Sequence, residues 1–381
     1  MLCIDLPQDV RTADYPGIGW NAKRDKKNVG TGPADSGTGP LVTITGSNIR
    51  SVFYGVYDLL ERRAGCHWFW DGDVVPRRDT IDLSGLDIHE EARFEWRGLR
   101  YFAHRGLTRF QAEHWGFEYW RHEIDWLLKR RLNVFMLRIG QDDLFRLVWD
   151  IRDDKWADAY WKLTTTAVEA FGRPGGGLLH TISLGERLCY REREKNLELK
   201  LMALDKFLKR AHRDYPKKKV LLAGWDFYFT WYPDEVKALV KTLDPERDII
   251  WDYEGDATQD YRPEMKKVGG NDFTKWGVVG KFPYTYSIFL AFENALDVRA
   301  NYDVIEARQK LVQGDPMCKG FVFWPEASHT DPLCIRYFTA NAWSHRPVPH
   351  GEVLKEFCAS RGGGRGLLAP RGRRQDRVPA R

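Results

Sequence analysis

The stretch Gly320-Phe-Val-Phe-Trp-Pro-Glu326 is apolar up to its last residue, which is a carboxylate. A short apolar run bounded by turn residues is typical of a strand buried on both faces, as in parallel sheets covered by helices. The proline restricts the backbone just before Glu326. The run therefore predicts a buried parallel strand that holds a glutamate rigidly at its carboxyl end.

Working outward from this run, strands and helices alternate from Phe94 to about residue 346, which is typical of βα units. This alternation predicts a (β/α)8 TIM-type barrel over residues 94–346. We expect parallel strands near 97–102, 133–139, 179–184, 219–224, 248–252, 279–284 and 320–324, with helices near 118–131, 156–171, 194–213 and 304–312.

Residues 1–93 are expected to form a small N-terminal α/β domain. Leu41–Thr45 alternates like a strand, and Ser47 or Asn48 suits the N-cap of the next helix. Residues 347–381 predict a helix remnant and a basic disordered tail. Met1–Val10 has no signal-peptide pattern and resembles the middle of a domain, so we expect a shortened chain, cytoplasmic if this N-terminus is native.

Charge and composition exclude several classes of partner. The tail 361–381 holds seven arginines and one aspartate, so its charge is +6. Since the net charge of the whole chain is +5, the rest of the chain carries about −1. A nearly neutral body argues against a nucleic-acid partner, and no apolar run is long enough for a membrane helix. The six cysteines and ten histidines form neither a CxxC nor an HExxH pattern, so we expect free thiols, no metal and no cofactor.

The chain contains 16 tryptophans and 16 tyrosines, whose flat faces and polar edges suit sugar rings, although most will be core residues. In a barrel of this type the active site lies where strands end. Several predicted strand ends carry carboxylates, which favours a carbohydrate substrate and glycoside hydrolysis by a pair of carboxyl groups. The expected substrate-binding residues are His104, Trp225, Asp226, Asp252, Glu254, Tyr284, Trp324 and His329.

Glu326 and Glu186 are the expected catalytic pair. Glu326 on its rigid strand end suits a nucleophile, and Glu186, after an apolar strand and Gly185, suits a general acid with a raised pKa. A retaining mechanism places the two carboxyl groups about 5–5.5 Å apart. Two structural alternatives stay open for each residue. Glu326 could cap the following helix or pair with a neighbouring arginine, and Glu186 could be a charge at a helix N-terminus or pair with Arg187 or Arg191. Ion pairing is equally open for Asp226, Asp252 and Glu254.

Several segments, taken in order, resemble the alpha-N-acetylglucosaminidase family over roughly residues 41–346. Trp120-Arg-His-Glu-Ile-Asp-Trp126 with Leu132-Asn133 resembles W-x-x-E-I-D-W…I-N, and Gly224-Trp-Asp-Phe227 resembles G-W-L-F. The other matches are Ile249–Glu254 to L-V-L-D-L-F, Lys281–Tyr284 to Q-P-F-I, Pro325-Glu326 to A-P-E-G-I, and Ala342-Trp343 to L-G-W.

The resemblance implies a retaining exo-acting hydrolase that releases terminal, alpha-linked N-acetylglucosamine. It maps the family's nucleophile to Glu326 and its acid/base to Glu186. The chain departs from the family pattern in lacking F-N-E and in carrying Ser287–Asn294 where the family has H-N-F-G-G-N. These departures keep two alternatives open: a catalytically inactive carbohydrate-binding barrel, and a glycosidase for another sugar, such as a beta-hexosaminidase-like enzyme or an alpha-glucuronidase. Arg97, Arg100 and Arg105 would suit the uronic acid that an alpha-glucuronidase binds.

Overall fold

The computed structural model describes residues 2–4, 26–32, 41–100, 117–136, 178–180, 193–217, 219–228, 231–258, 268–290, 301–325 and 331–361. Its centre is a large sheet in which every pairing between neighbouring strands is parallel. In chain order the strands are β7 (Trp96–Arg100), β8 (Val134–Met136), β9 (Leu178–His180), β10 (Lys219–Ala223), β11 (Asp248–Trp251), β12 (Tyr284–Leu290) and β13 (Cys318–Pro325).

The order of strands across this sheet is β8-β7-β13-β12-β11-β10-β9. The first strand of this sheet in chain order, β7, therefore pairs with the last, β13, with Gly320 opposite Trp96. Pairing between the first and the last strand is the connection that closes a βα barrel. Among the described residues β8 and β9 are the two edges of the sheet, so a parallel α/β half-barrel is established and its closure into a (β/α)8 barrel stays a prediction.

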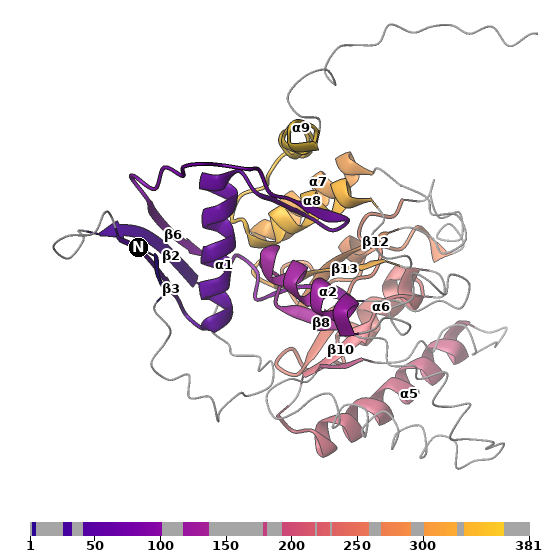
Figure 1. Ribbon diagram of the computed structural model, residues 1–381. Helices are drawn as coiled ribbons and strands as arrows, with labels where there is room; N and C mark the ends of the chain where they lie inside the picture. The colour runs from indigo at the N-terminus through magenta and orange to yellow at the C-terminus, as the bar shows by residue number, and fades with distance from the viewer. Residues whose placement is uncertain are drawn as a thin grey trace, which may run out of the picture.

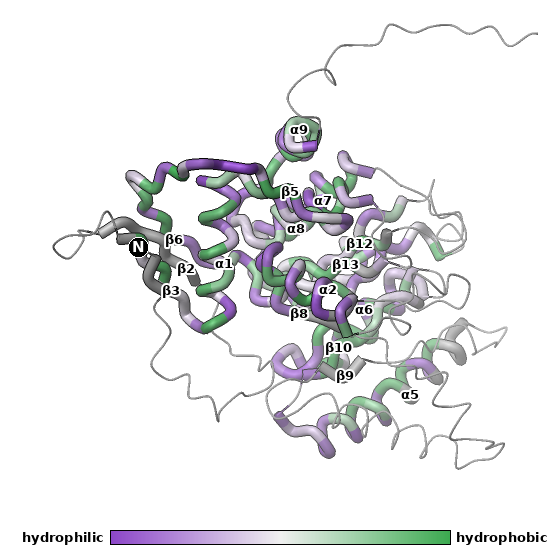
Figure 2. Tube along the Cα trace, viewed as in Figure 1, coloured by the Kyte–Doolittle hydropathy of each residue, from purple (hydrophilic) through white to green (hydrophobic). Residues whose placement is uncertain are grey.

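The helices form because apolar residues recur at helical spacing on the face that meets the sheet. In α5 (Arg193–Asp214), Leu204, Leu208 and Ala211 are buried while Lys209 is exposed, and Figure 2 shows the corresponding mixture of hydrophobic and hydrophilic residues along this helix. The other helices are α2 (Phe117–Lys129), α6 (Pro233–Val240), α7 (Tyr302–Gly314), α8 (Pro332–Trp343) and α9 (His350–Arg361), with short 3-10 turns η5 (Asp226–Tyr228) and η7 (Phe273–Lys275).

An N-terminal unit, residues 2–4, 26–32 and 41–93, adds a smaller sheet in the order β1-β3-β2-β6. The strands are β1 (Leu2–Ile4), β2 (Lys26–Gly32), β3 (Leu41–Gly46) and β6 (Asp87–Glu91). A separate hairpin of β4 (His67–Phe69) and β5 (Gly72–Val74) comes between β3 and β6 in the chain. Helix α1 (Ile49–Leu59) stands between the small sheet and the large one, and a single π-helical turn, η1 (Leu60–Ala64), continues it (Figure 1). Asn48 caps α1 by accepting a hydrogen bond from the Ser51 amide, as one of the two expected caps.

The N-terminal unit packs on the end of the large sheet where its strands begin, which we call the base. Tyr54 Oη donates to the carbonyl of Leu132, two residues before β8, at 2.7 Å. Arg93 donates to the carbonyls of Gln313 and Asp315, just before β13. Because the strands of the large sheet are all parallel, their carboxyl ends lie together at the opposite end of the sheet, which we call the top.

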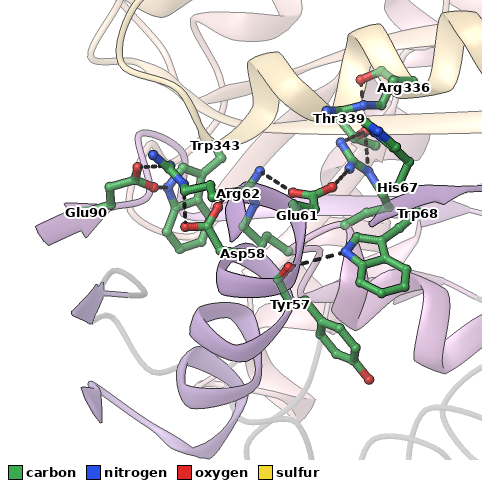
Figure 3. A network of polar contacts seen from close by, with 12 residues as sticks. Tyr57, Asp58, Glu61, Arg62, His67, Trp68, Glu90, Arg336, Thr339 and Trp343 are labelled. Carbon is green, nitrogen blue, oxygen red and sulfur yellow. Dashed lines mark hydrogen bonds and ion pairs between the residues drawn. The ribbon is translucent and has the colours of Figure 1, made fainter. Parts of the chain in front are cut away.

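A network of charged side chains fastens the base (Figure 3). Arg130, 1% exposed, donates to Glu61 Oε1 at 3.0 Å and twice to Thr339 Oγ1 on α8. Arg131 binds Asp58 Oδ1 at 2.8 Å. Burial, together with charge repulsion from Arg336, lowers the pKa of Arg130 to about 9, so the guanidinium still carries its charge at neutral pH. The network therefore ties α1, the end of α2 and α8 into one support.

One predicted strand is misplaced. The expected strand at 279–284 is instead a tight turn, in which Gly277 and Gly280 have φ values of 79° and 70° and Lys281 N donates to the Val278 carbonyl. Strand β12 begins only at Tyr284 and runs to Leu290. Glycines at positive φ are turn signals, and the true strand, Tyr-Thr-Tyr-Ser-Ile-Phe-Leu, is rich in aromatic and β-branched residues.

Candidate active site

The two expected catalytic residues follow strand ends that the structure describes. Strand β13 ends at Pro325, so Glu326 is the next residue in the chain, and Glu186 comes six residues after the end of β9 at His180. Glu326, Glu186, His104 and His329 themselves lie outside the described residues. Their roles and the expected spacing of the two carboxyl groups stay predictions.

Contacts within the large sheet show which way its side chains point. On β12 the ring of Tyr286 lies 5.2 Å from that of Phe321 and 6.0 Å from that of Phe338 on α8, so Tyr286 faces the helices. Ser287, the next residue, accepts a 2.6 Å hydrogen bond from the indole of Trp251 on β11. Since neighbouring residues of a strand point to opposite faces, Ser287 and Trp251 lie on the face turned away from the helices, which we call the inner face.

Aromatic rings gather at the top of the inner face. Trp225, two residues after the end of β10, makes edge contacts with Tyr253 at 6.2 Å and with Phe289 at 6.0 Å between ring centroids. Tyr253 in turn stacks on Trp251 at 4.1 Å. We call Trp225, Trp251, Tyr253, Ser287 and Phe289 the inner wall. Trp225 is partly exposed and the other four are buried, so Trp225 is the wall residue that can present a ring face to a ligand.

Trp225 therefore lies at the expected end of the sheet, but the sequence did not predict all the other residues of the inner wall. Trp251 and Phe289 were not expected at the site. The signal that could have found them is their register: each lies on the inner face of its strand, at or near the carboxyl end. The sequence did not reveal this register because a strand was expected at 279–284, whereas β12 begins at Tyr284.

Asp252, which was expected to accept a sugar hydroxyl, is instead occupied by contacts within the protein. It directly follows the end of β11 at Trp251 and is fully buried. Its Oδ1 accepts a hydrogen bond from Tyr228 Oη, and its Oδ2 accepts the Ser287 amide at 3.2 Å. Burial raises the pKa of Asp252 to about 8, although both hydrogen bonds and the charge of Arg308 oppose that rise.

Tyr284 is also misplaced by the sequence reasoning. It is the first residue of β12, not the last, and its hydroxyl donates to Asp315 Oδ2 at 3.0 Å, next to the start of β13. This puts Tyr284 at the base of the sheet, where it supports the β12–β13 pair. It therefore cannot border a cleft at the top.

Of three further expected residues, the structure describes Glu254 fully and Asp226 and Trp324 only in part. Glu254 follows the end of β11 and is fully buried; since the strand ends at Trp251, Glu254 and Asp252 do not share a strand face as expected. Asp226 begins η5, directly after Trp225. Trp324 lies in β13, paired with Phe289 of β12. The side chains of Asp226 and Trp324 lie outside the described residues.

Arg97, one of the three arginines that were considered for binding a uronic acid, lies away from the top of the sheet. Arg97 is fully buried and donates to the carbonyls of Arg131 and Phe94 at 2.9 and 2.7 Å. Its guanidinium also lies 5.0 Å from the ring centroid of Trp343 at the end of α8. Arg97 therefore belongs to the base and brings no charge to the top of the sheet.

Within the part of the chain that the structure describes, no group of His, Cys, Asp and Glu side chains is arranged to hold a metal ion. None of the described helices is long and apolar enough to cross a membrane. Cys66, Cys318, Cys334 and Cys358 are free thiols. A hollow lined by Asp71–Val74, Ser360 and Arg361 lies beside the end of α9 and shares no residue with the inner wall.

No protein-family model matches the sequence, and a search of curated proteins finds no match. Solved structures do match. The chain is similar to a family 89 glycoside hydrolase from Clostridium perfringens in complex with 2-acetamido-1,2-dideoxynojirmycin, with a TM-score of 0.61, 12% identity and 96% of this chain covered. The same bacterium's enzyme in complex with PUGNAc gives a TM-score of 0.57, at the same identity and coverage.

A third similar structure is a form of the Clostridium perfringens enzyme with two glutamate-to-glutamine substitutions, in complex with its substrate GlcNAc-alpha-1,4-galactose. Its TM-score is 0.62, at 12% identity and 96% coverage of this chain. The chain spans about half the length of these enzymes, since 48% of each is covered. This chain therefore shares the fold of the matching half of a family 89 glycoside hydrolase.

Proposed function

We propose that this protein is a retaining exo-glycoside hydrolase that releases terminal, alpha-linked N-acetylglucosamine, with Glu326 as nucleophile and Glu186 as general acid and base. The observation that carries the proposal is the end of β13. Its residues Phe321 and Phe323 contact Phe338 on the helix side, so the even positions of this strand belong to the inner face. We propose that Glu326, the residue that follows Pro325 at the end of β13, continues this even series and so reaches the sugar above the inner wall.

The position of Glu186 in the chain supports its pairing with Glu326. Strand β9, which precedes Glu186, is four places from β13 in the order of the sheet. In an eight-stranded barrel, strands four places apart face each other across the axis. Two carboxyl groups brought in from opposite sides can flank one glycosidic bond, as retaining hydrolysis requires.

We assign the sugar ring to the top of the inner wall. Trp225 offers an aromatic face for the C–H side of the ring, and His104, Asp226, Trp324 and His329 are proposed around it because each belongs to a strand end or follows one. The choice of N-acetylglucosamine rests on the sequence resemblance and on the ligands of the similar structures, two of which are a 2-acetamido dideoxynojirmycin and a GlcNAc disaccharide.

The test is turnover of nitrophenyl glycosides. We expect hydrolysis of the α-linked N-acetylglucosaminide and weak or no hydrolysis of the β-linked N-acetylglucosaminide, the α-glucoside and the α-glucuronide. Retention means that the first product seen by NMR is the α-anomer. A protein that cleaves only another glycoside refutes the proposed substrate, and a β-anomer as first product refutes retention.

A second candidate, a carbohydrate-binding barrel without catalysis, is favoured by one observation. Residues 287–290, where the related family has its H-N-F-G-G-N loop, are part of strand β12 in this chain. The site is therefore built differently at this position. Binding of N-acetylglucosamine by calorimetry, without turnover of any glycoside at any pH tested, would establish this candidate in place of the first.

A further inference from the structure

Strands β11 and β12 differ in length at the top of the sheet. Strand β11 ends at Trp251, opposite Thr285, whereas β12 continues to Leu290 and stays paired with β13 on its other side. In a parallel ladder, alternate residues direct their amide and carbonyl groups to the same neighbouring strand. Beyond Trp251, the groups that β12 turns toward β11 are therefore those of Ser287 and Phe289.

Side chains after β11 take the place of the missing strand. Asp252 Oδ2 accepts the Ser287 amide at 3.2 Å, and Asp256 Oδ1 accepts the Phe289 amide at 3.1 Å. Between them the amide of Gly255 donates to the Ser287 carbonyl at 2.8 Å. We call residues 252–256 the acidic clamp.

The clamp lies flat against β12 and is fixed from behind. A Cβ at Gly255 would come within 2.2 Å of the Tyr286 ring, so only glycine allows this approach. Arg308 on α7 donates to the carbonyls of Gly255 and Ala257, and Asn301 donates to the carbonyl of Asp256 at 2.7 Å. Helix α7 thus holds the clamp, and the clamp holds the end of β12.

The amides that the clamp binds belong to inner-wall residues. The Ser287 hydroxyl accepts the hydrogen bond of the Trp251 indole, and the ring of Phe289 makes an edge contact with Trp225 at 6.0 Å between centroids. We propose that Asp252 and Asp256 are positioning residues, which fix the backbone of Ser287 and Phe289 so that Trp225 is held ready for a sugar ring. The part of this inference that concerns sugar binding rests on the proposed function.

The test uses Asp256→Ala, the conservative Asp256→Asn, and Asp315→Ala as a matched control. Asp315 is also buried and accepts backbone amides, those of Gly280 and Met317, but it does so at the base. Hydrogen–deuterium exchange is followed by mass spectrometry on peptides that cover residues 284–290. Losing a hydrogen bond to a buried carboxylate should speed exchange at Phe289 by about 10-fold or more in Asp256→Ala.

We expect Asp256→Asn, which keeps an acceptor oxygen, to restore most of the protection at Phe289, and Asp315→Ala to leave it as in the wild type. We also expect KM for the α-linked N-acetylglucosaminide to rise about 5–10-fold in Asp256→Ala, with kcat within about 2-fold, because the change weakens ground-state binding. Unchanged exchange at Phe289 in Asp256→Ala would overturn the clamp. Faster exchange with an unchanged KM would overturn its positioning role.

A failure of the proposed function gives a different pattern. If the wild type turns over no glycoside, the exchange measurement still decides whether the clamp exists. Calorimetric titration with N-acetylglucosamine then replaces KM: weaker binding in Asp256→Ala than in Asp315→Ala supports the positioning role, and equal binding overturns it.

Discussion

Polar side chains at the two ends of the large sheet hold different parts of the chain together. At the base, buried Arg130 joins side chains from distant segments, Glu61 after α1 and Thr339 on α8. At the top, Asp252 and Asp256 hold the backbone of a single strand, β12, and the partly exposed Trp225 contacts Phe289 of that strand. We therefore expect the base to contribute mainly to stability and the top to bind the ligand, as is usual in βα barrels.

The sharpest way to test this division is to remove the proposed nucleophile at the top. We expect Glu326→Gln to lower kcat for the α-linked N-acetylglucosaminide by several orders of magnitude, because the amide keeps the shape of the carboxylate but cannot attack. Substrate should still bind, and the free energy of unfolding should change little. Turnover close to that of the wild type would reject Glu326 as the nucleophile.

A change at the base should have the opposite profile. We expect Arg130→Met to lower the free energy of unfolding by roughly 3 kcal/mol, because it leaves Glu61 and Thr339 without their buried partner. KM should not change, since the top is untouched. The matched control is Arg121→Met, which breaks the exposed pair of Arg121 with Glu118 and should cost less than about 1 kcal/mol. Urea unfolding of both variants measures the difference, and equal losses would contradict a special role for the base.

The pH dependence of stability tests the description of Asp252. Its pKa is raised to about 8 in the folded protein, from an unfolded value of 3.8, so the protonated form favours folding. This contribution is complete below the unfolded pKa and is lost as the pH rises through 8, with a slope of up to about 1.4 kcal/mol per pH unit. We expect Asp252→Asn, which does not titrate, to flatten urea-unfolding free energies between pH 5 and 8. An identical slope in both proteins would show that Asp252 is ionised throughout.

The smallest expected effects separate two aromatic residues, both of which the sequence assigned to the site. Trp225→Ala should raise KM about 5–10-fold through the loss of ring contact with the sugar. Tyr284→Phe should leave KM unchanged and lower the free energy of unfolding by about 1 kcal/mol, because it loses only the hydrogen bond to Asp315 at the base. A raised KM in Tyr284→Phe would contradict its place in this account.

Much of the architecture was predictable because it depends on local patterns. The expected strands near 133–139, 219–224, 248–252 and 320–324 correspond to β8, β10, β11 and β13, and they are parallel within one sheet as expected. The helices at 118–131 and 194–213 correspond to α2 and α5 within one residue or two at each end. Apolar periodicity and turn residues specify such elements without reference to the rest of the chain.

The register at the top was not predictable in the same way. A strand that is buried on both faces is apolar on both, so its sequence does not reveal by alternation which residues face the helices and which face inward. The direction of Asp252, just after such a strand, could therefore not be read from the sequence. The clamp depends on where β11 ends relative to β12, which is a tertiary property. Arg97 was misjudged for a related reason: its partners are the Arg131 carbonyl and Trp343, which are distant in sequence.

The central claim is that a carboxylate at the top of the sheet attacks the sugar, and covalent trapping tests it most directly. An activated, ring-fluorinated α-N-acetylglucosaminide slows hydrolysis of the glycosyl-enzyme, so the intermediate of a retaining enzyme accumulates. After digestion, mass spectrometry should find the sugar on the peptide that contains Glu326, and no label in Glu326→Gln. A label on another carboxylate, or release of the sugar without any covalent adduct, would contradict the account.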